Sequence, residues 1–241
     1  MTVFATRLVG TEQLADGTMA FHLERPDNFE YRPGQAVDLQ LVEDTAGQTL
    51  ANVSHTFSLV SAPHEPVLTL ATRMRDSQYK LALGALSEGA PLWLGEPFGT
   101  ALVADATERP LVMIAGGIGI TPFMSILRDA AHSQKQRPLR LLYSNRRPED
   151  TAFLAELQEL ERNYPAFAML ATMTNMAASA QDWDGATGYL DEEKISDFCQ
   201  DLEQPLYFLS GPPALVEAMF DVLEDAGIDE DDICSEGFTG Y

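Results

Sequence analysis

Hydrophobic and polar residues alternate over short distances through the first 105 residues of the chain. Runs rich in β-branched and aromatic side chains are separated by clusters of Gly, Pro, Asp and Asn, a pattern typical of short strands joined by turns. The predicted strands are Thr2–Leu8, Thr18–Leu23, Ala36–Leu41, His55–Val60, Val67–Arg73 and Pro91–Leu94. One helical pattern, Ser77–Leu86, begins with Asp76 or Ser77 as its cap. The pattern predicts a small antiparallel β-barrel that carries one helix.

From Arg109 onward, short apolar strands alternate with longer helical runs. The predicted strands are Leu111–Ala115, Leu139–Tyr143, Phe167–Met173, Leu206–Leu209 and Asp232–Gly237, and the predicted helices include Pro148–Arg162, Glu192–Leu202 and Ala214–Ala226. Alternation of strands and helices predicts a parallel sheet, whose ligands bind at the carboxyl ends of the strands.

The first strand of this region runs into a glycine-rich turn. Leu111–Ala115 is apolar without alternation, as expected for a strand covered on both faces. The glycines that follow are Gly116, Gly117 and Gly119. Thr121 and Pro122 then supply a helix N-cap and a first-turn proline. Free N–H groups at such a helix start suit the diphosphate of a dinucleotide. A plain tight connection is the alternative, because the spacing is not that of the Rossmann fingerprint.

Length and composition favour two domains in a cytoplasmic protein. The chain has 241 residues, of which 45% are hydrophobic, and no apolar run is long enough to span a membrane. The N-terminal residues show no apolar core of a signal peptide. Two cysteines, Cys199 and Cys234, are too few for a four-thiolate iron–sulfur cluster. We therefore expect no metal site.

The chain is strongly acidic, with a formal net charge of -22 and an isoelectric point near 4.3. This charge argues against nucleic acid and anionic membrane surfaces as partners. The acidic residues are concentrated in the second half of the chain, where solvated surface charge is the simplest interpretation.

Several short motifs occur in an order that resembles the ferredoxin-NADP reductase family of flavoproteins. They are YRPGQ (31–35), HTFSL (55–59), EPFG (96–99), GGIGITP (116–122), SGPP (210–213) and the terminal EGFTGY. The resemblance covers nearly the whole chain. It implies an FAD-binding antiparallel β-barrel domain over residues 1–105 and a Rossmann-like α/β domain that binds NAD(P) over residues 106–241.

On the barrel, the resemblance implies that the flavin is held by His55, Thr56, Phe57 and Ser58. An aromatic ring such as Phe57 can cover the isoalloxazine, and the Ser58 hydroxyl can bond near its reactive nitrogen, which makes Ser58 a catalytic candidate. His55 stands where the family more often has arginine, so other groups must hold the phosphates. The candidates are Ala71, Thr72, Arg73, Arg75 and the helix start at Ser77, with Lys80 as an auxiliary.

On the nicotinamide side, Ser210, Gly211 and Pro212 match the family's Cys-Gly-Pro motif. The resemblance places Ser210 at the reacting carbon and Glu236 close to the flavin, so both are catalytic candidates. Either Phe238 or Tyr241 would stack on the flavin.

The preference between NADH and NADPH stays open. Asn145, Arg146 and Arg147 follow the second parallel strand, where an arginine can pair with a 2'-phosphate. The next strand ends in 173–176, MTNM, where NADP-specific relatives tend to have a Ser-Arg pair. We also expect that Gly119→Val places a side chain against the pyrophosphate and raises KM for the nicotinamide.

The resemblance implies an FAD-dependent NAD(P)H oxidoreductase that passes electrons to a separate acceptor, such as a ferredoxin, a flavodoxin, an oxygenase component or free flavin. An acidic ferredoxin would be repelled by the net charge unless Arg32, Arg73 and Arg75 form a basic patch. Two alternatives remain open: a flavin or ferric reductase that uses flavin as a substrate, and a nucleotide-sensing module without turnover.

Overall fold

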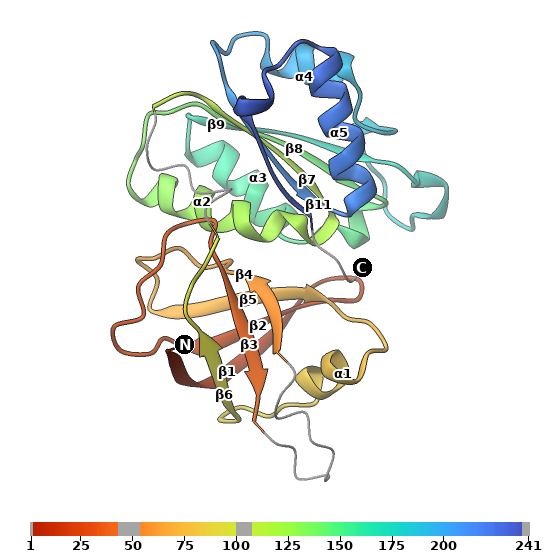
Figure 1. Cartoon of the computed structure of the whole chain (residues 1–241). Helices are drawn as coiled ribbons and strands as arrows, with labels where there is room; N and C mark the ends of the chain where they lie inside the picture. The colour runs from red at the N-terminus through yellow and green to blue at the C-terminus, as the bar shows by residue number, and fades with distance from the viewer. Residues whose placement is uncertain (1, 43–53, 100–107, 238–241) are drawn as a thin grey trace. The chain divides into compact units, whose positions relative to one another are not determined.

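The computed structural model describes residues 2–42, 54–99 and 108–237. The chain divides into two compact units. The barrel unit contains Met1–Val103 and Thr121–Asp129, and the sheet unit contains Ala104–Ile120 and Ala130–Tyr241 (Figure 1). The predicted domain boundary at residue 105 lies outside the described residues and stays a prediction.

The barrel unit is built on a six-stranded antiparallel sheet in the order β4-β3-β6-β1-β2-β5. Its elements are β1 (Val3–Ala15), β2 (Thr18–Glu24), β3 (Ala36–Leu41), β4 (Ser54–Ser58), β5 (Val67–Arg73), α1 (Gln78–Gly84) and β6 (Pro91–Gly95). A bridge between Leu59 and Leu70, with Val60 N–H donating to the Thr69 carbonyl at 2.8 Å, joins the two ends of the sheet. The sheet therefore closes, which confirms the predicted antiparallel barrel.

Alternation along β3 shows why the sequence forms this barrel. Val37, Leu39 and Leu41 are buried in the barrel core, whereas Asp38 and Gln40 between them are half-exposed. Burial of each of these aliphatic side chains contributes roughly 1.5–3 kcal/mol. The period of two fixes the register, because a shift of one residue would place Asp38 in the core.

Strand β1 is longer than predicted. It continues beyond Leu8 to Ala15 and pairs with β6 through its first half and with β2 through its second. The second half contains the polar residues Thr11, Glu12 and Gln13, which gave no hydrophobic signal. Register shifts between Leu8 and Gly10 and between Gln13 and Ala15 mark where the strand departs from regular pairing.

The sheet unit is built on a six-stranded parallel sheet in the order β10-β9-β8-β7-β11-β12. Its strands are β7 (Leu111–Gly116), β8 (Leu139–Asn145), β9 (Phe167–Met173), β10 (Ala186–Thr187), β11 (Leu206–Gly211) and β12 (Ile233–Gly237), and its helices are α3 (Leu154–Asn163), α4 (Glu192–Cys199) and α5 (Pro213–Asp225). Short 3-10 turns occupy Gly117–Ile120, Pro148–Asp150, Met176–Ala178 and Glu230–Asp232. The predicted parallel α/β sheet is confirmed, and β10 was missed because it has only two residues.

Helices flank this sheet. Figure 1 shows α4 and α5 on one side and α3 on the other, and side chains of α4 and α5 share one core with the sheet. Helix α3 begins at Leu154 instead of Pro148, because Phe153 has a φ of 60°, in the left-handed region where a helix cannot continue. Helix α2 (Thr121–His132) follows β7, and its residues 121–129 are counted with the barrel unit.

The strand order of the parallel sheet reverses between β7 and β11. From β7 the chain proceeds to β8 and β9 on one side, and then returns to β11 and β12 on the other. Connections therefore leave the carboxyl ends of β7 and β11 in opposite directions. This arrangement is a topological switch point, where doubly wound sheets bind their ligands.

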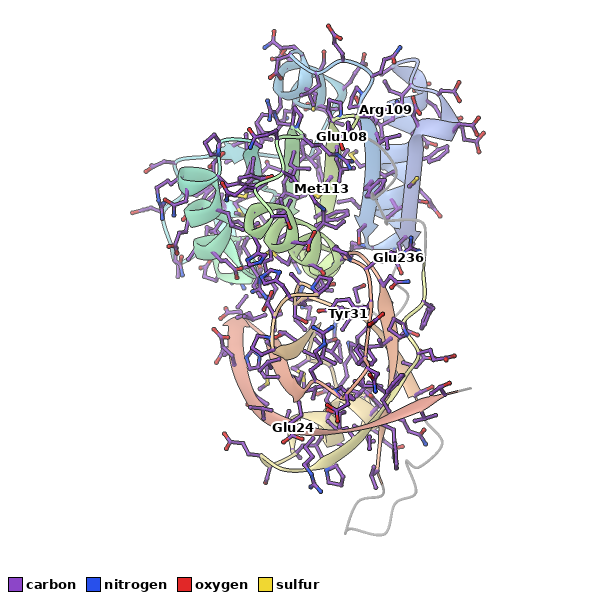
Figure 2. The ribbon with its side chains drawn as sticks, turned by 90° about the vertical axis from the view of Figure 1, so that its left-hand side faces the viewer. Glu24, Tyr31, Glu108, Arg109, Met113 and Glu236 are labelled. Atoms are coloured by element: carbon purple, nitrogen blue, oxygen red, sulfur yellow. The ribbon has the colours of Figure 1, made fainter. Side chains whose placement is uncertain are left out.

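A bidentate ion pair joins the segments that lead into the amino ends of β7 and β12; its arginine, Arg109, is labelled in Figure 2. The Arg109 guanidinium donates to the two carboxylate oxygens of Asp232 at 2.7 and 2.6 Å, and its Nε donates to the Gln204 carbonyl at 2.7 Å. Arg109 precedes β7 and Asp232 precedes β12, so the contact joins segments 123 residues apart. The hydrogen bonds from Arg109 lower the pKa of Asp232.

We expect Asp232→Asn to lower the free energy of unfolding by about 0.5–1 kcal/mol at pH 7, since the two side chains are roughly one-third exposed. A lowered carboxylate pKa contributes stability that is present above the ordinary value of 3.8 and is lost as pH falls through the folded pKa. The difference in Tm between the variant and the unsubstituted protein should therefore vanish in acid. Asp231→Asn, at an exposed neighbour, is the matched control. Equal effects of both substitutions would refute a specific role for the ion pair.

Candidate functional site

The glycine turn follows β7 directly at the switch point. Gly117 has a φ of 53°, a left-handed conformation in which a side chain is strained, and open space lies where its Cβ would be. Residues Gly117–Ile120 form a 3-10 turn, and α2 begins at Thr121. The sequence predicted Thr121 as the N-cap, whereas in the structure Thr121 is the first residue of the helix. Pro122 lies in the first turn.

Gly119 packs against the end of β11, a contact that the sequence did not predict. A Cβ on Gly119 would lie 2.3 Å from the Ser210 carbonyl oxygen and 2.6 Å from the Gly211 Cα. The absence of a side chain allows the turn to pack against the backbone at the end of β11. A valine at Gly119 would displace the protein's own backbone, and the effect of Gly119→Val on pyrophosphate binding stays a prediction.

Gly116 and Gly211 also allow close packing between the end of β7 and the end of β11. A Cβ on Gly211 would lie 3.0 Å from the Gly116 nitrogen, and one on Gly116 would lie 2.8 Å from Leu215 and 3.0 Å from Pro212. Pro212 is the N-cap of α5, so the SGPP motif is a strand end that turns directly into a helix. The glycine turn and the SGPP motif form one compact backbone surface.

Tyr143 of β8 is hydrogen-bonded to the glycine turn, a role that the sequence analysis missed. Its ring is fully buried, and its hydroxyl donates to the Gly117 carbonyl at 3.0 Å and approaches the Ala152 carbonyl at 3.2 Å. The sequence analysis placed Tyr143 only as the last residue of a predicted strand. No pattern within the sequence pairs it with a turn 26 residues away.

Ser210 and Glu236 lie side by side on neighbouring strands. Ser210 pairs in register with Ala115 of β7 and with Glu236 of β12. The Ser210 side chain is fully buried, and its hydroxyl has no hydrogen-bond partner among the described residues. Burial raises the pKa of Glu236 above its ordinary value, so its carboxyl group retains its proton to higher pH than an exposed glutamate. The structure thus brings two of the three predicted catalytic residues together.

The carboxyl end of β8 holds Asn145 and Arg146. Asn145 is buried, and its amide nitrogen has no partner among the described residues, whereas Arg146 is exposed. The backbone carbonyls of Asn145 and Arg146 accept from Thr174 and Asn175, at 2.9 and 2.8 Å. The segment after β9 is therefore bonded to the end of β8.

In the barrel unit, the HTFS motif lies on β4. Phe57 is buried in the core, Thr56 is exposed and donates to Asp38 at 2.6 Å, and Ser58 is 3% exposed. The Ser58 hydroxyl is buried without a hydrogen-bond partner in the described part of the chain. His55 stacks on Tyr79 of α1, with ring centroids 4.0 Å apart. Tyr79, which the sequence analysis did not single out, also donates to the Leu39 carbonyl at 2.6 Å.

Positive charge gathers beside this motif, at the start of α1. Ser77 caps α1 by accepting from the Lys80 N–H at 3.2 Å, which settles the choice between Asp76 and Ser77. The Lys80 ammonium donates to the Arg73 carbonyl at 2.7 Å. Burial and the charge of Arg75 lower the pKa of Lys80. Burial and the charge of Lys80 lower the pKa of His55. The cationic groups therefore destabilise one another, and an anion beside them would relieve this.

The residues at the carboxyl ends of the parallel strands fit the predicted NAD(P), and those around β4 and α1 fit the predicted FAD. Buried polar atoms without partners are rare, because each costs about 1–3 kcal/mol. Three of them belong to predicted site residues: Ser58 Oγ, Asn145 Nδ2 and Ser210 Oγ. Ala71 and Thr72 are buried in β5, which leads to the cationic start of α1. The role of each residue stays a prediction, and Phe238 and Tyr241 lie outside the described residues.

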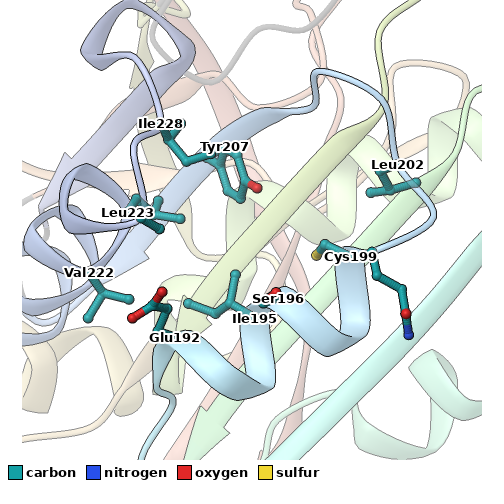
Figure 3. Close-up of a pocket in the computed structure, with 11 residues that line it drawn as sticks. Glu192, Ile195, Ser196, Cys199, Leu202, Tyr207, Val222, Leu223 and Ile228 are labelled. Carbon is teal, nitrogen blue, oxygen red and sulfur yellow. The ribbon is translucent and has the colours of Figure 1, made fainter.

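A cavity of about 270 Å³ opens between α4, β11 and α5 (Figure 3). Cys199 and Tyr207 line it, and none of its lining residues was predicted to bind a cofactor. Burial raises the pKa of Cys199 to about 11, so this thiol is protonated and unreactive at neutral pH. Within the described residues, no three His, Cys, Asp or Glu side chains are grouped to hold a metal ion, and no helix is long and apolar enough to cross a membrane.

Comparisons with known proteins agree with this arrangement. A model of the oxidoreductase NAD-binding domain matches residues 113–221. The chain is 28% identical to the glycine betaine monooxygenase reductase subunit of Chromohalobacter salexigens over 92% of this chain and 60% of that protein. It is 26% identical to the propane 2-monooxygenase reductase component of Mycolicibacterium smegmatis, over 89% of this chain and 61% of that protein. The chain thus spans about three-fifths of the length of these curated relatives.

A solved structure shows the same fold. The ferredoxin NADP+ reductase of Neisseria gonorrhoeae with bound FAD and NADP superposes with a TM-score of 0.81 and 21% sequence identity. The match covers 98% of this chain and 99% of that one. At this identity, the likeness establishes the fold: an antiparallel barrel followed by a parallel α/β sheet.

We expect Gly119→Ala to destabilise the protein by about 1–3 kcal/mol, the usual effect of an added methyl in a filled site. The methyl would collide with the Ser210 carbonyl, which belongs to a strand and cannot move freely. Thermal unfolding should show a Tm lowered by several degrees. Gly10→Ala is the control, since its Cβ would meet only a glutamate oxygen at 3.8 Å. A Tm equal to that of the unsubstituted protein would contradict the packing role of Gly119.

Proposed function

We propose that the chain is a member of the ferredoxin-NADP reductase-like family and acts as an FAD-dependent NAD(P)H oxidoreductase that delivers electrons to a separate acceptor; the match to the oxidoreductase NAD-binding domain and the similarity to reductase subunits support this. The observation that carries the proposal is the switch point. There the Ser210 hydroxyl is buried without a partner between Ala115 and Glu236, beside a glycine turn stripped of side chains. Most buried hydroxyl groups in native proteins are hydrogen-bonded, so a buried hydroxyl without a partner supports a ligand at this position.

The residues of the sheet unit have distinct roles in this proposal. The N–H groups of the glycine turn and the start of α2 receive the diphosphate of the nicotinamide dinucleotide. Ser210 orients the nicotinamide ring through its free hydroxyl. Glu236, whose pKa is raised by burial, lies beside Ser210 as a group for proton transfer. Gly116, Gly211 and Pro212 shape the surface between them.

The residues of the barrel unit hold the flavin. Arg73, Arg75 and Lys80, with the Ser77 helix start, provide the positive charge for its diphosphate. His55 contributes a ring stacked on Tyr79, and Ser58 contributes a donor to the isoalloxazine edge. When bound, FAD accepts two electrons from NAD(P)H and releases them one at a time, which the side chains of the protein cannot do themselves.

The acceptor is proposed to be an oxygenase component, with a ferredoxin or a flavodoxin as further possibilities. The two curated relatives above carry the names of monooxygenase reductase subunits. The two cysteines of the chain cannot ligate a four-thiolate cluster, so the one-electron centre lies outside these 241 residues. The predicted cytoplasmic location stays a prediction.

The proposal is tested by purifying the protein and following its flavin. We expect FAD to remain bound through gel filtration and its absorbance near 450 nm to bleach within seconds when NADH or NADPH is added without oxygen. Colourless protein that is active only with added flavin would show that flavin is a substrate instead. Bound flavin that neither nucleotide reduces would overturn the enzymatic function.

We expect Ser58→Ala to slow flavin reduction by about 10-fold or more, which corresponds to the loss of one hydrogen bond worth about 1.4 kcal/mol. Because the Ser58 hydroxyl has no partner in the described residues, its removal should leave the barrel folded. Stopped-flow absorbance measures the reduction, and Tm measures stability. Ser54→Ala, at the exposed start of β4, is the control. An unchanged reduction rate would remove Ser58 from the site.

A further inference from the structure

We propose, resting on the proposed function, that the protein uses NADH in preference to NADPH. The reason lies in the ribose rim, defined as residues 145–150 after β8 and residues 173–180 after β9. The guanidinium group of Arg147 in this rim is already hydrogen-bonded to the carboxylate of Asp150. The rim as a whole has no net charge.

The topology indicates why this rim would meet the adenosine ribose. In doubly wound sheets a dinucleotide lies across the switch point, and a side chain after the second strand contacts the ribose next to the adenine. In this sheet the corresponding strand is β8, which neighbours β7 on the side away from β11. An acidic residue there bonds a 2'-hydroxyl, whereas an arginine accommodates a 2'-phosphate.

Hydrogen bonds join the two segments of the rim. Thr174 and Asn175 donate their backbone N–H groups to the carbonyls of Asn145 and Arg146. The Thr151 hydroxyl donates to the Arg147 carbonyl at 2.9 Å. The backbone of the rim is therefore held in place by hydrogen bonds between its two segments.

The guanidinium group of Arg147 is hydrogen-bonded within the protein. Its guanidinium donates to both carboxylate oxygens of Asp150, at 2.9 and 2.8 Å, and to the Ala178 carbonyl at 3.3 Å. The Asp150 side chain is only 7% exposed, so the pair is shielded from water on that side. A fork that already holds a carboxylate in two parallel bonds has no matching face for a phosphate.

Glu149 adds a negative charge that is also fixed. Its carboxylate accepts from the Ala180 N–H at 2.6 Å and from the Ser179 hydroxyl at 2.9 Å. Hydrogen bonds from its own backbone, from Ala180 and from Ser179 lower its pKa, so it is ionised at neutral pH.

The charges of the rim can then be compared with those of the two nucleotides. Arg146 and Arg147 balance Glu149 and Asp150, and residues 173–180 carry no charge. The 2'-phosphate of NADPH would add a charge of about -1.5 to -2, and only the exposed Arg146 would face it without a carboxylate partner among the described residues. One exposed ion pair contributes little. The 2'-hydroxyl of NADH is neutral and both donates and accepts hydrogen bonds, so it suits this rim.

The first test uses the unsubstituted protein. Anaerobic stopped-flow reduction of the flavin should be at least about tenfold more efficient, as kcat/KM or its single-turnover equivalent, with NADH than with NADPH. Equal efficiency or a preference for NADPH would overturn this inference and leave the proposed function standing. Failure of both nucleotides to reduce bound flavin would overturn the proposed function, and this inference with it.

The second test removes the carboxylate that pairs with Arg147. Asp150→Asn should raise the efficiency with NADPH by about tenfold and change that with NADH by less than about twofold, because Arg147 becomes available. Glu159→Gln, an exposed acidic residue on α3, makes the same change in net charge and is the matched control. An equal gain in both variants would show a general charge effect and overturn the assignment to Arg147.

A binding readout makes the test independent of turnover. Calorimetry with 2',5'-ADP against 5'-ADP should show weak binding of the 2'-phosphate probe by the unsubstituted protein and stronger binding by Asp150→Asn. If Asp150→Asn has a strongly lowered Tm, Asn175→Arg provides a second variant, since it adds a cation to the rim without breaking the ion pair. No gain in 2',5'-ADP affinity from Asn175→Arg would then count against the rim as the ribose site.

Discussion

The approach of two backbones at the switch point is the constraint on which the sheet unit depends. The glycine turn after β7 lies so close to the end of β11 that neither Gly119 nor Gly211 has room for an unstrained side chain. This contact sets the position of the glycine turn relative to the Ser210 hydroxyl. Tyr143 holds the turn from the side of β8. A diphosphate site and a nicotinamide site built on this junction would keep a constant separation, because both belong to one packed element.

Charge imposes a second constraint, since both proposed cofactors are anions and the chain carries a net charge of -22. Long-range repulsion of this kind is screened within about 8–10 Å at physiological salt, so the local charges decide binding. In the barrel unit the local charges are cationic, and Lys80 and His55 both have pKa values lowered partly by neighbouring positive groups. In the ribose rim they cancel. The same acidic protein can therefore attract a flavin diphosphate while it rejects an additional phosphate on the nucleotide.

The sequence predicts the architecture well because hydrophobic periodicity reflects burial directly. The apolar run of β7 and the alternation of β3 each specify which faces are covered, and both strands lie where they were predicted. Periodicity gives no information about contacts between distant segments. The pairing of Ser210 with Glu236, the Tyr143 bond to Gly117 and the stacking of His55 on Tyr79 all join residues far apart in the chain. Gly119 illustrates the difference: the sequence identified the residue, but it gave no sign that Gly119 packs against the Ser210 carbonyl.

The unsatisfied polar atoms link the stability of this protein to its ligands. Ser58 Oγ, Asn145 Nδ2 and Ser210 Oγ are each buried without a partner in the described residues, at about 1–3 kcal/mol apiece. Together they amount to a substantial part of the 5–15 kcal/mol that stabilises a typical domain. Apolar residues of similar size would remove this destabilisation, so the retention of polar groups implies a gain in another state. A ligand that satisfies these atoms binds only the folded chain and stabilises it by mass action. In the proposed function, the same atoms that weaken the unliganded fold would direct where the cofactors bind.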